Sequence, residues 1–271
     1  MSGEHFAFDD YISDTRSIEV ELSKLALDML QHVKLDPEKD YLGLMAASFA
    51  YKQLEHFKSI RLLVDAGQYR DAVAICRIMM EGVIILKWAS EEPTERPLNW
   101  IKYSAVERYR RLYDTPMYAE HKALIESDLK LYGNQFLKKE SRTKPFSEIT
   151  PNDYIPNWRG IPAGDKFEKK GIKDIFKDTG HGEIHETIYN PSSGWLHWDS
   201  LSLQEAVGID GGAFIYGVET KHLGVASLAV GFDSLNETSN LLDDHFKLGY
   251  TSNLTKLGND HRAILERTKR K

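Results

Sequence analysis

The stretch AVAICRIMMEGVIILKW, from Ala72 to Trp88, is almost entirely apolar. Apolar residues on all sides of a helix predict that other helices surround it. Two charged residues, Arg77 and Glu81, interrupt the stretch one helical turn apart, so their side chains project from the same face. Charges inside a buried helix need partners that offset their desolvation. The stretch that indicates the fold therefore also indicates a polar site.

Apolar residues recur at helical spacing on both sides of this stretch. One helix is expected from about residue 41 to residue 66, where Gly67 suits a C-terminal cap, and the apolar helix itself from residue 68 to 90. Further helices are expected over residues 18–30, 98–114, 118–140, 165–178 and 214–247. We find no convincing pair of strands, so the pattern predicts an all-α protein.

Two segments break the helical pattern. Residues 141–164 contain four prolines and no sustained period, which predicts a Pro-rich loop or insert that packs along the surface. Residues 256–271 form a basic tail, which we expect to be partly frayed. The expected architecture is a single helical domain over residues 1–271, an irregular multi-helix bundle with the helix around Arg77 buried at its centre.

Composition narrows the class of protein. The 271-residue chain has a net charge of -6 and a pI near 5.9, so it has no overall attraction to nucleic acids or anionic membranes. Its single cysteine, Cys76, excludes a disulfide framework and favours a reducing compartment. The acidic N-terminus lacks the features of a secretory signal, and the longest apolar run is too short to span a bilayer. We expect a cytoplasmic protein that does not bind membranes.

A second polar segment offers partners for Arg77 and Glu81. It runs from His181 to Asp199 and supplies His181, Glu183, His185, Glu186, Tyr189, Ser193, His197 and Asp199. If the segment packs on the apolar helix, Arg77 can bind an anion, Glu81 can orient an imidazole, and His197 can act as an acid or a base. The same residues can instead form a salt-bridge network that only registers the helices. Both interpretations stay open.

These residues also carry a resemblance. Arg-x-x-x-Glu in an apolar helix, followed later by Tyr-x-x-x-Ser-x-x-x-His, resembles the uncharacterised bacterial proteins grouped as domain-of-unknown-function family 5677. The matching positions are Arg77, Glu81, Tyr189, Ser193 and His197, and the resemblance covers about residues 40 to 220. It implies an all-helical bacterial cytoplasmic protein and implies no reaction. Helix content and an Arg/His pairing are distantly similar to the HEPN ribonucleases, but no arginine here precedes a histidine by four to six residues.

Several other chemistries lack their signatures. His181 and His185 are spaced for zinc, but Gly182 stands where a zincin has glutamate. The sequence lacks the two Glu-x-x-His motifs of a di-iron bundle, and it lacks the Gly-x-Ser-x-Gly elbow of a serine hydrolase. The glycine-rich residues 208–217 follow no strand and lack the phosphate-loop signatures. We therefore expect no metal ion and no cofactor.

Two function classes remain. One is a non-catalytic helical module that binds a small ligand or a partner protein. The other is a metal-independent ribonuclease or toxin-like effector with Arg77, Glu81 and His197 as catalytic residues, although the net charge does not favour RNA. In either class the supporting residues are Arg70, Tyr189, Ser193 and His185. A homodimer is compatible with both.

Overall fold

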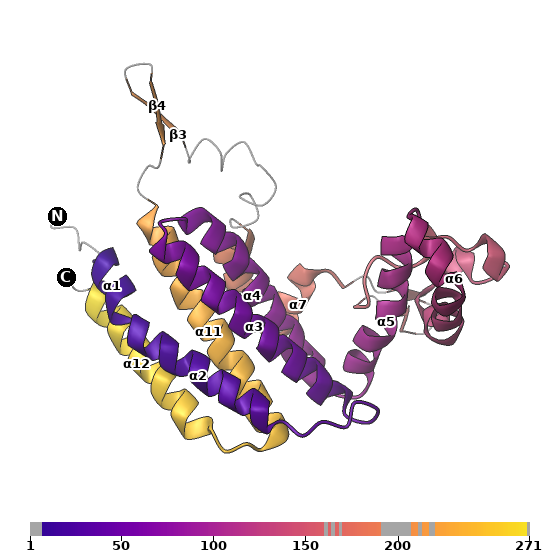
Figure 1. Cartoon of the computed structure of the whole chain (residues 1–271), viewed down its shortest axis with the longest axis horizontal. Helices are drawn as coiled ribbons and strands as arrows, with labels where there is room; N and C mark the ends of the chain where they lie inside the picture. The colour runs from indigo at the N-terminus through magenta and orange to yellow at the C-terminus, as the bar shows by residue number, and fades with distance from the viewer. Residues whose placement is uncertain are drawn as a thin grey trace. The chain divides into compact units, whose positions relative to one another are not determined.

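Helices dominate the protein. The computed structural model describes residues 7–159, 162–163, 166–167, 170–190, 207–210, 213–216 and 220–269. Within these ranges the chain is a multi-helix assembly, which confirms the all-α class (Figure 1). Two short antiparallel strand pairs differ from the expectation of no strands. They are β1 (Pro162–Ala163) with β2 (Lys166–Phe167), and β3 (Val207–Asp210) with β4 (Ala213–Tyr216).

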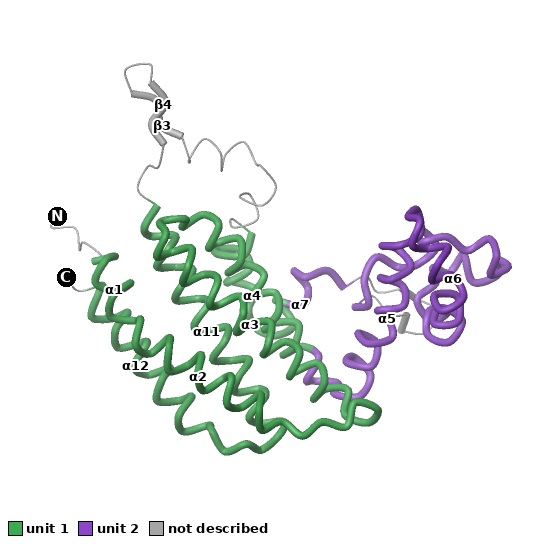
Figure 2. The backbone as a smooth tube through the Cα atoms, in the orientation of Figure 1, with its two compact units in different colours: residues 1–88, 176–271 green, residues 89–175 purple. Residues whose placement is uncertain are grey.

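The chain forms two compact units (Figure 2). Unit 1 combines Met1–Trp88 with Phe176–Lys271, and unit 2 consists of Ala89–Ile175. Unit 1 is thus built from two stretches that are far apart in the sequence. The single domain expected over residues 1–271 stays a prediction.

Helices make up most of the described part of unit 1. They include α1 (Phe8–Asp14), α2 (Arg16–His32), α3 (Tyr41–Asp65), α4 (Tyr69–Ser90), α11 (Lys221–Phe246) and α12 (Thr251–Lys269). The bounds of α3 and α4 agree with the sequence prediction. Helix α11 begins later than expected, because residues 213–216 pair as β4.

The basic C-terminal tail, of which residues 256–269 are described, belongs to α12. Helix α12 continues to Lys269, and it contacts α1, α2 and α11. Leu254, Leu257 and His261 are buried on one face of α12, and Thr268 is buried in its last turn. Burial of this face stabilises a segment whose charged composition alone suggests a solvated end.

Helices α3 and α11 pack along each other in unit 1 (Figure 1), and α4 contacts each of them through individual side chains. Gly231 of α11 leaves room for the side chains of Phe57 and Ile60 of α3. Gln53 of α3 donates a hydrogen bond from Nε2 to the backbone oxygen of Met79 in α4, at 2.8 Å. Helix α4 therefore packs within the bundle over much of its length, as its apolar sequence predicts.

Unit 2 contains α5 (Glu95–Leu112), α6 (Pro116–Asp128) and short helical turns. These turns are η1 (Leu129–Gly133), η2 (Asn134–Phe136), η3 (Lys139–Ser141), η4 (Phe146–Glu148) and η5 (Pro151–Asp153). The Pro-rich segment, of which residues 141–159 and 162–163 are described, contains η4 and η5. The hydroxyls of Tyr103 and Tyr109 donate to the backbone oxygens of Ile155 and Ile149, at 2.6 and 2.8 Å, and so hold the segment against α5.

Within the described part of the chain, no helix has the length and apolarity needed to cross a bilayer.

Candidate functional site

The polar site begins with two half-buried side chains on α4, Arg77 and Glu81. Opposite them lies a segment of short helical turns, with α7 (Ile172–Asp178), α8 (Gly182–Ile184) and the π-helical turn η6 (His185–Tyr189). Residues 176–190 belong to unit 1 together with α4. Single π-helical turns are rare in proteins, and those that occur often lie at functional sites.

The hydroxyl of Tyr189 bridges the two charges on α4. Arg77 donates from Nη2 to the Tyr189 oxygen at 2.8 Å, and the Tyr189 hydroxyl donates to Oε2 of Glu81 at 3.0 Å. The guanidinium also lies over the tyrosine ring, with Cζ 4.4 Å from the ring centroid. Tyr189 is buried. The phenol thus gives each charge one charge-assisted hydrogen bond. The charges inside the apolar helix therefore hold the segment from Phe176 to Asn190 against α4.

Two further rings extend this contact. His185 stacks on Tyr189 with centroids 5.2 Å apart and an interplanar angle of 27°. Phe176 contacts both rings, with centroids 5.3 Å from His185 and 5.0 Å from Tyr189. The buried His185 has its Nδ1 3.5 Å from a carboxylate oxygen of Glu186. The three rings pack on one another within the segment. Tyr189 then connects this packed segment to Arg77 and Glu81 of α4.

The other residues predicted for the site have different outcomes. Ser193 and His197 lie outside the described residues, so their catalytic and supporting roles stay predictions. Arg70 is half-buried in the first turn of α4, two turns before Arg77. The structure brings together Arg77, Glu81, Tyr189 and His185.

A cavity of about 480 Å³ lies beside this cluster, between α4, residues 176–188, α11 and α12. Its apolar wall comes from Met80, Val83 and Ile84 of α4, Phe176, Ile184 and Ile188 of the docked segment, Val230 of α11 and Leu265 of α12. Its polar wall comes from His181, Asp233, Ser234, Asn236, Glu237, His261 and Arg262. An apolar pocket with a few polar groups is typical of small-molecule sites.

The polar wall is organised by interactions of its own. Lys87 donates to Oε1 of Glu237 at 2.7 Å. Oδ1 of Asp233 lies 3.4 Å from Nδ1 of His261. The Oδ1 atom of Asn236 is buried and has no hydrogen-bond partner among the described residues. The Asn236 oxygen is therefore an acceptor available to a ligand in the cavity. The carboxylates of Glu237 and Asp233, in contrast, already lie beside nitrogen atoms of Lys87 and His261.

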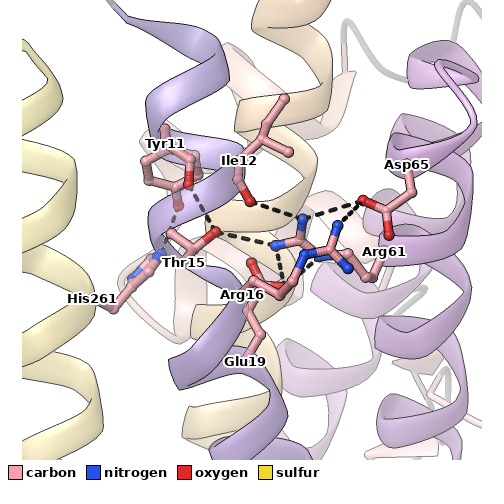
Figure 3. Close-up of polar contacts among 8 residues, drawn as sticks. All are labelled: Tyr11, Ile12, Thr15, Arg16, Glu19, Arg61, Asp65 and His261. Atoms are coloured by element: carbon pink, nitrogen blue, oxygen red, sulfur yellow. Dashed lines mark hydrogen bonds and ion pairs between the residues drawn. The ribbon is translucent and has the colours of Figure 1, made fainter.

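His261 also connects the cavity to a buried polar network (Figure 3). Its Nε2 lies 2.7 Å from the hydroxyl of the fully buried Tyr11. Burial, reinforced by the carboxylates of Glu19 and Asp233, raises the pKa of Tyr11 well above its usual value. Tyr11 therefore stays protonated and serves as a structural partner of His261 and not as a nucleophile.

The sequence analysis missed the residues that α11 and α12 contribute to the cavity. A signal was present, because Asp233, Asn236 and Glu237 recur at spacings of three and four in an otherwise apolar helix, which places them on one face. His261 carried no comparable signal. Its role depends on contacts with residues 28 and 250 positions away. Among the described residues no group of three metal-binding side chains is present.

Comparison with known proteins supports the resemblance seen in the sequence. Residues 44–214, which are more than half of the chain, match the model of a family of unknown function (DUF5677). The match includes Arg77, Glu81 and Tyr189 and ends before α11 and α12. No match to a curated protein or to a solved structure was found. The chain belongs to the DUF5677 family.

Proposed function

We propose that this protein is a ligand-binding module and that the cavity between α4, residues 176–188, α11 and α12 takes a small amphipathic molecule. The observation that carries this proposal is the composition of the cavity wall, with an apolar side next to a polar side. Its volume of about 480 Å³ lies within the range of small-molecule pockets, roughly 300–1,000 Å³.

The charges of the wall indicate a ligand without a large net charge. Asp233 and Glu237 are the acidic groups, Arg262 is the basic group, and Lys87 pairs with Glu237. These charges balance, so the wall attracts neither a strong cation nor a strong anion. The unpartnered oxygen of Asn236 favours a ligand that donates a hydrogen bond.

The cluster of Arg77, Glu81 and Tyr189 has a positioning role in this proposal. It holds the segment that supplies Phe176 and Ile188 to the cavity wall. A site is more selective when its wall is held in place before the ligand arrives. The ribonuclease alternative requires His197, which lies outside the described residues, and it stays a prediction.

The proposal is tested by filling the cavity. We expect several members of a library of small neutral aromatic and aliphatic amides to bind the wild type in ligand-observed NMR. Val230→Trp places a large ring into the cavity from a half-buried position, and it should abolish this binding. The control is Leu124→Trp, at an exposed position that does not line the cavity, and it should bind as the wild type does.

Two outcomes would overturn the proposal. One is the absence of binding by every compound in the library. The other is unchanged binding to Val230→Trp, once circular dichroism has shown that the variant is folded. Growth inhibition on overexpression, lost in Arg77→Ala, would instead support the toxin-like alternative.

A further inference from the structure

A second hollow lies on unit 1, in a groove between α2 and α3. Its volume is about 410 Å³. Val20 and Leu27 of α2 and Leu62 of α3 line the groove with side chains that are 48%, 43% and 70% exposed, and the buried Phe57 lies beneath them. Large apolar side chains gathered around a hollow indicate a binding surface more strongly than scattered ones do.

A buried carboxylate with unused hydrogen-bonding capacity lines the same groove. Glu19 is only 4% exposed, and its Oε2 accepts a hydrogen bond from Nε of Arg61 at 2.6 Å. Its other oxygen, Oε1, has no hydrogen-bond partner in the part of the chain that the structure describes. A buried acceptor without a donor is unfavourable, and native proteins leave few of them. A donor that enters the groove beside Glu19 would satisfy this oxygen.

The arginine beside Glu19 is already held in place (Figure 3). Arg61 also donates from Nη1 to the backbone oxygen of Ile12 at 3.0 Å and from Nη2 to Oγ1 of Thr15 at 3.1 Å. The Thr15 hydroxyl in turn donates to the backbone oxygen of Tyr11. Arg61 thus already donates hydrogen bonds to Ile12, Thr15 and Glu19, and it holds the Glu19 carboxylate in one position. The free oxygen is a preorganised acceptor.

The charges around the groove determine which donor fits. Four cationic side chains line it, Arg16, Lys24, Lys58 and Arg61, against the single carboxylate of Glu19. Asp65 and Glu55 pair with some of these cations at the margin. These cations would repel an ammonium group, and Arg61 already neutralises the charge of Glu19. The donor that fits belongs to an uncharged group.

We propose that the α2–α3 groove binds a small, mostly apolar, uncharged molecule that donates one N–H or O–H hydrogen bond to Oε1 of Glu19. A planar heteroaromatic molecule with a single N–H donor has this chemistry, because its ring packs on Val20, Leu27 and Leu62 while its edge meets the carboxylate. Indole is the simplest probe. This proposal is independent of the ligand proposed for the cavity between α4, α11 and α12, since the two hollows share no lining residue.

The test compares two probes that differ only at the donor. Indole and 1-methylindole are titrated into the full-length protein, and the dissociation constants are measured by NMR. Indole should bind, and 1-methylindole should bind at least about tenfold more weakly, because it cannot donate to a charged acceptor. Equal affinities would overturn the role of Glu19, and absence of binding by both, as expected for a groove that accepts only a partner's helix, would overturn the proposal.

A matched pair of variants tests whether indole binds in the α2–α3 groove. Leu62→Lys puts a charge into the apolar wall at an exposed position, and it should weaken indole binding at least about fivefold. Leu131→Lys makes the same change at a leucine of equal exposure (69%) in unit 2, and it should leave binding unchanged. Indole binding that is lost in Val230→Trp and retained in Leu62→Lys would overturn the groove proposal while supporting the cavity.

Discussion

At the scale of single residues, Tyr189 explains why charges stand inside the most apolar helix. Its hydroxyl accepts from Arg77 and donates to Glu81, so one neutral group provides a hydrogen bond to each ion. Without it, two half-buried charges on adjacent turns would lose one hydrogen bond each. Removing one partner of a buried polar contact costs more free energy than the contact contributes when complete.

We therefore expect Tyr189→Phe to lower the free energy of unfolding by about 1–2 kcal/mol. The ring remains, so its packing on His185 and Phe176 and its contact with the guanidinium should persist. Urea unfolding followed by far-ultraviolet circular dichroism measures the change. Tyr132→Phe, at an exposed tyrosine, is the control and should be neutral. A Tyr189→Phe protein as stable as this control would contradict the bridging role.

At the scale of elements, close approach of helices positions the walls of the cavity. Gly224 of α11 is buried against the ring of Tyr69 at the start of α4. A Cβ atom at position 224 would lie 2.9 Å from Cε1 of Tyr69, which is closer than real Cβ contacts. The absence of a side chain at Gly224 thus sets the spacing between α4 and α11, and both helices line the cavity.

Gly224→Ala is expected to destabilise the protein although alanine favours a helix. Helix propensity gains about 1 kcal/mol, and overpacking costs about 1–3 kcal/mol, so we expect a net loss of about 1 kcal/mol. The matched control is Gly258→Ala in α12, where the new Cβ meets only the side-chain nitrogen of Asn236 at 3.2 Å. Thermal unfolding should rank Gly224→Ala below the wild type and Gly258→Ala at or above it. The reverse order would argue against tight packing of α4 on α11.

At the scale of the whole molecule, both units bury tyrosines. Tyr11 belongs to unit 1, and Tyr103, Tyr109 and Tyr154 belong to unit 2. Burial raises the pKa of each, and that of Tyr154 to about 12. In the unfolded chain these groups titrate near pH 10. Between these values the unfolded state releases protons that the folded state retains.

Stability should therefore fall as pH rises above about 10, because proton release favours the unfolded chain. Urea unfolding between pH 8 and pH 12 measures this loss. Tyr154→Phe should reduce this loss, since the Tyr154 hydroxyl has no hydrogen-bond partner among the described residues and the variant removes none of their hydrogen bonds at neutral pH. Tyr51→Phe, at an exposed tyrosine, should leave the alkaline loss unchanged. An unaltered pH dependence in Tyr154→Phe would contradict the contribution of this buried phenol.

Local sequence patterns were sufficient to predict many of the helices and some of the residues of the site. Apolar periodicity and the Gly67 cap predicted α3 and α4 to within a few residues. The spacing of Arg77 and Glu81 placed both on one face, and the polar composition of residues 181–199 indicated their partner segment, from which Tyr189 reaches them. These inferences succeed because helix periodicity is a property of adjacent turns.

The sequence by itself determined the all-α class, the bounds of α3 and α4 and membership of the DUF5677 family. Only the tertiary structure decided that α12 buries one face, that His261 meets Tyr11, and that α2 and α3 leave a groove beside Glu19. Each of these depends on contacts between residues far apart in the chain. Such contacts arise from the packing of whole helices, and no local spacing of residues encodes them.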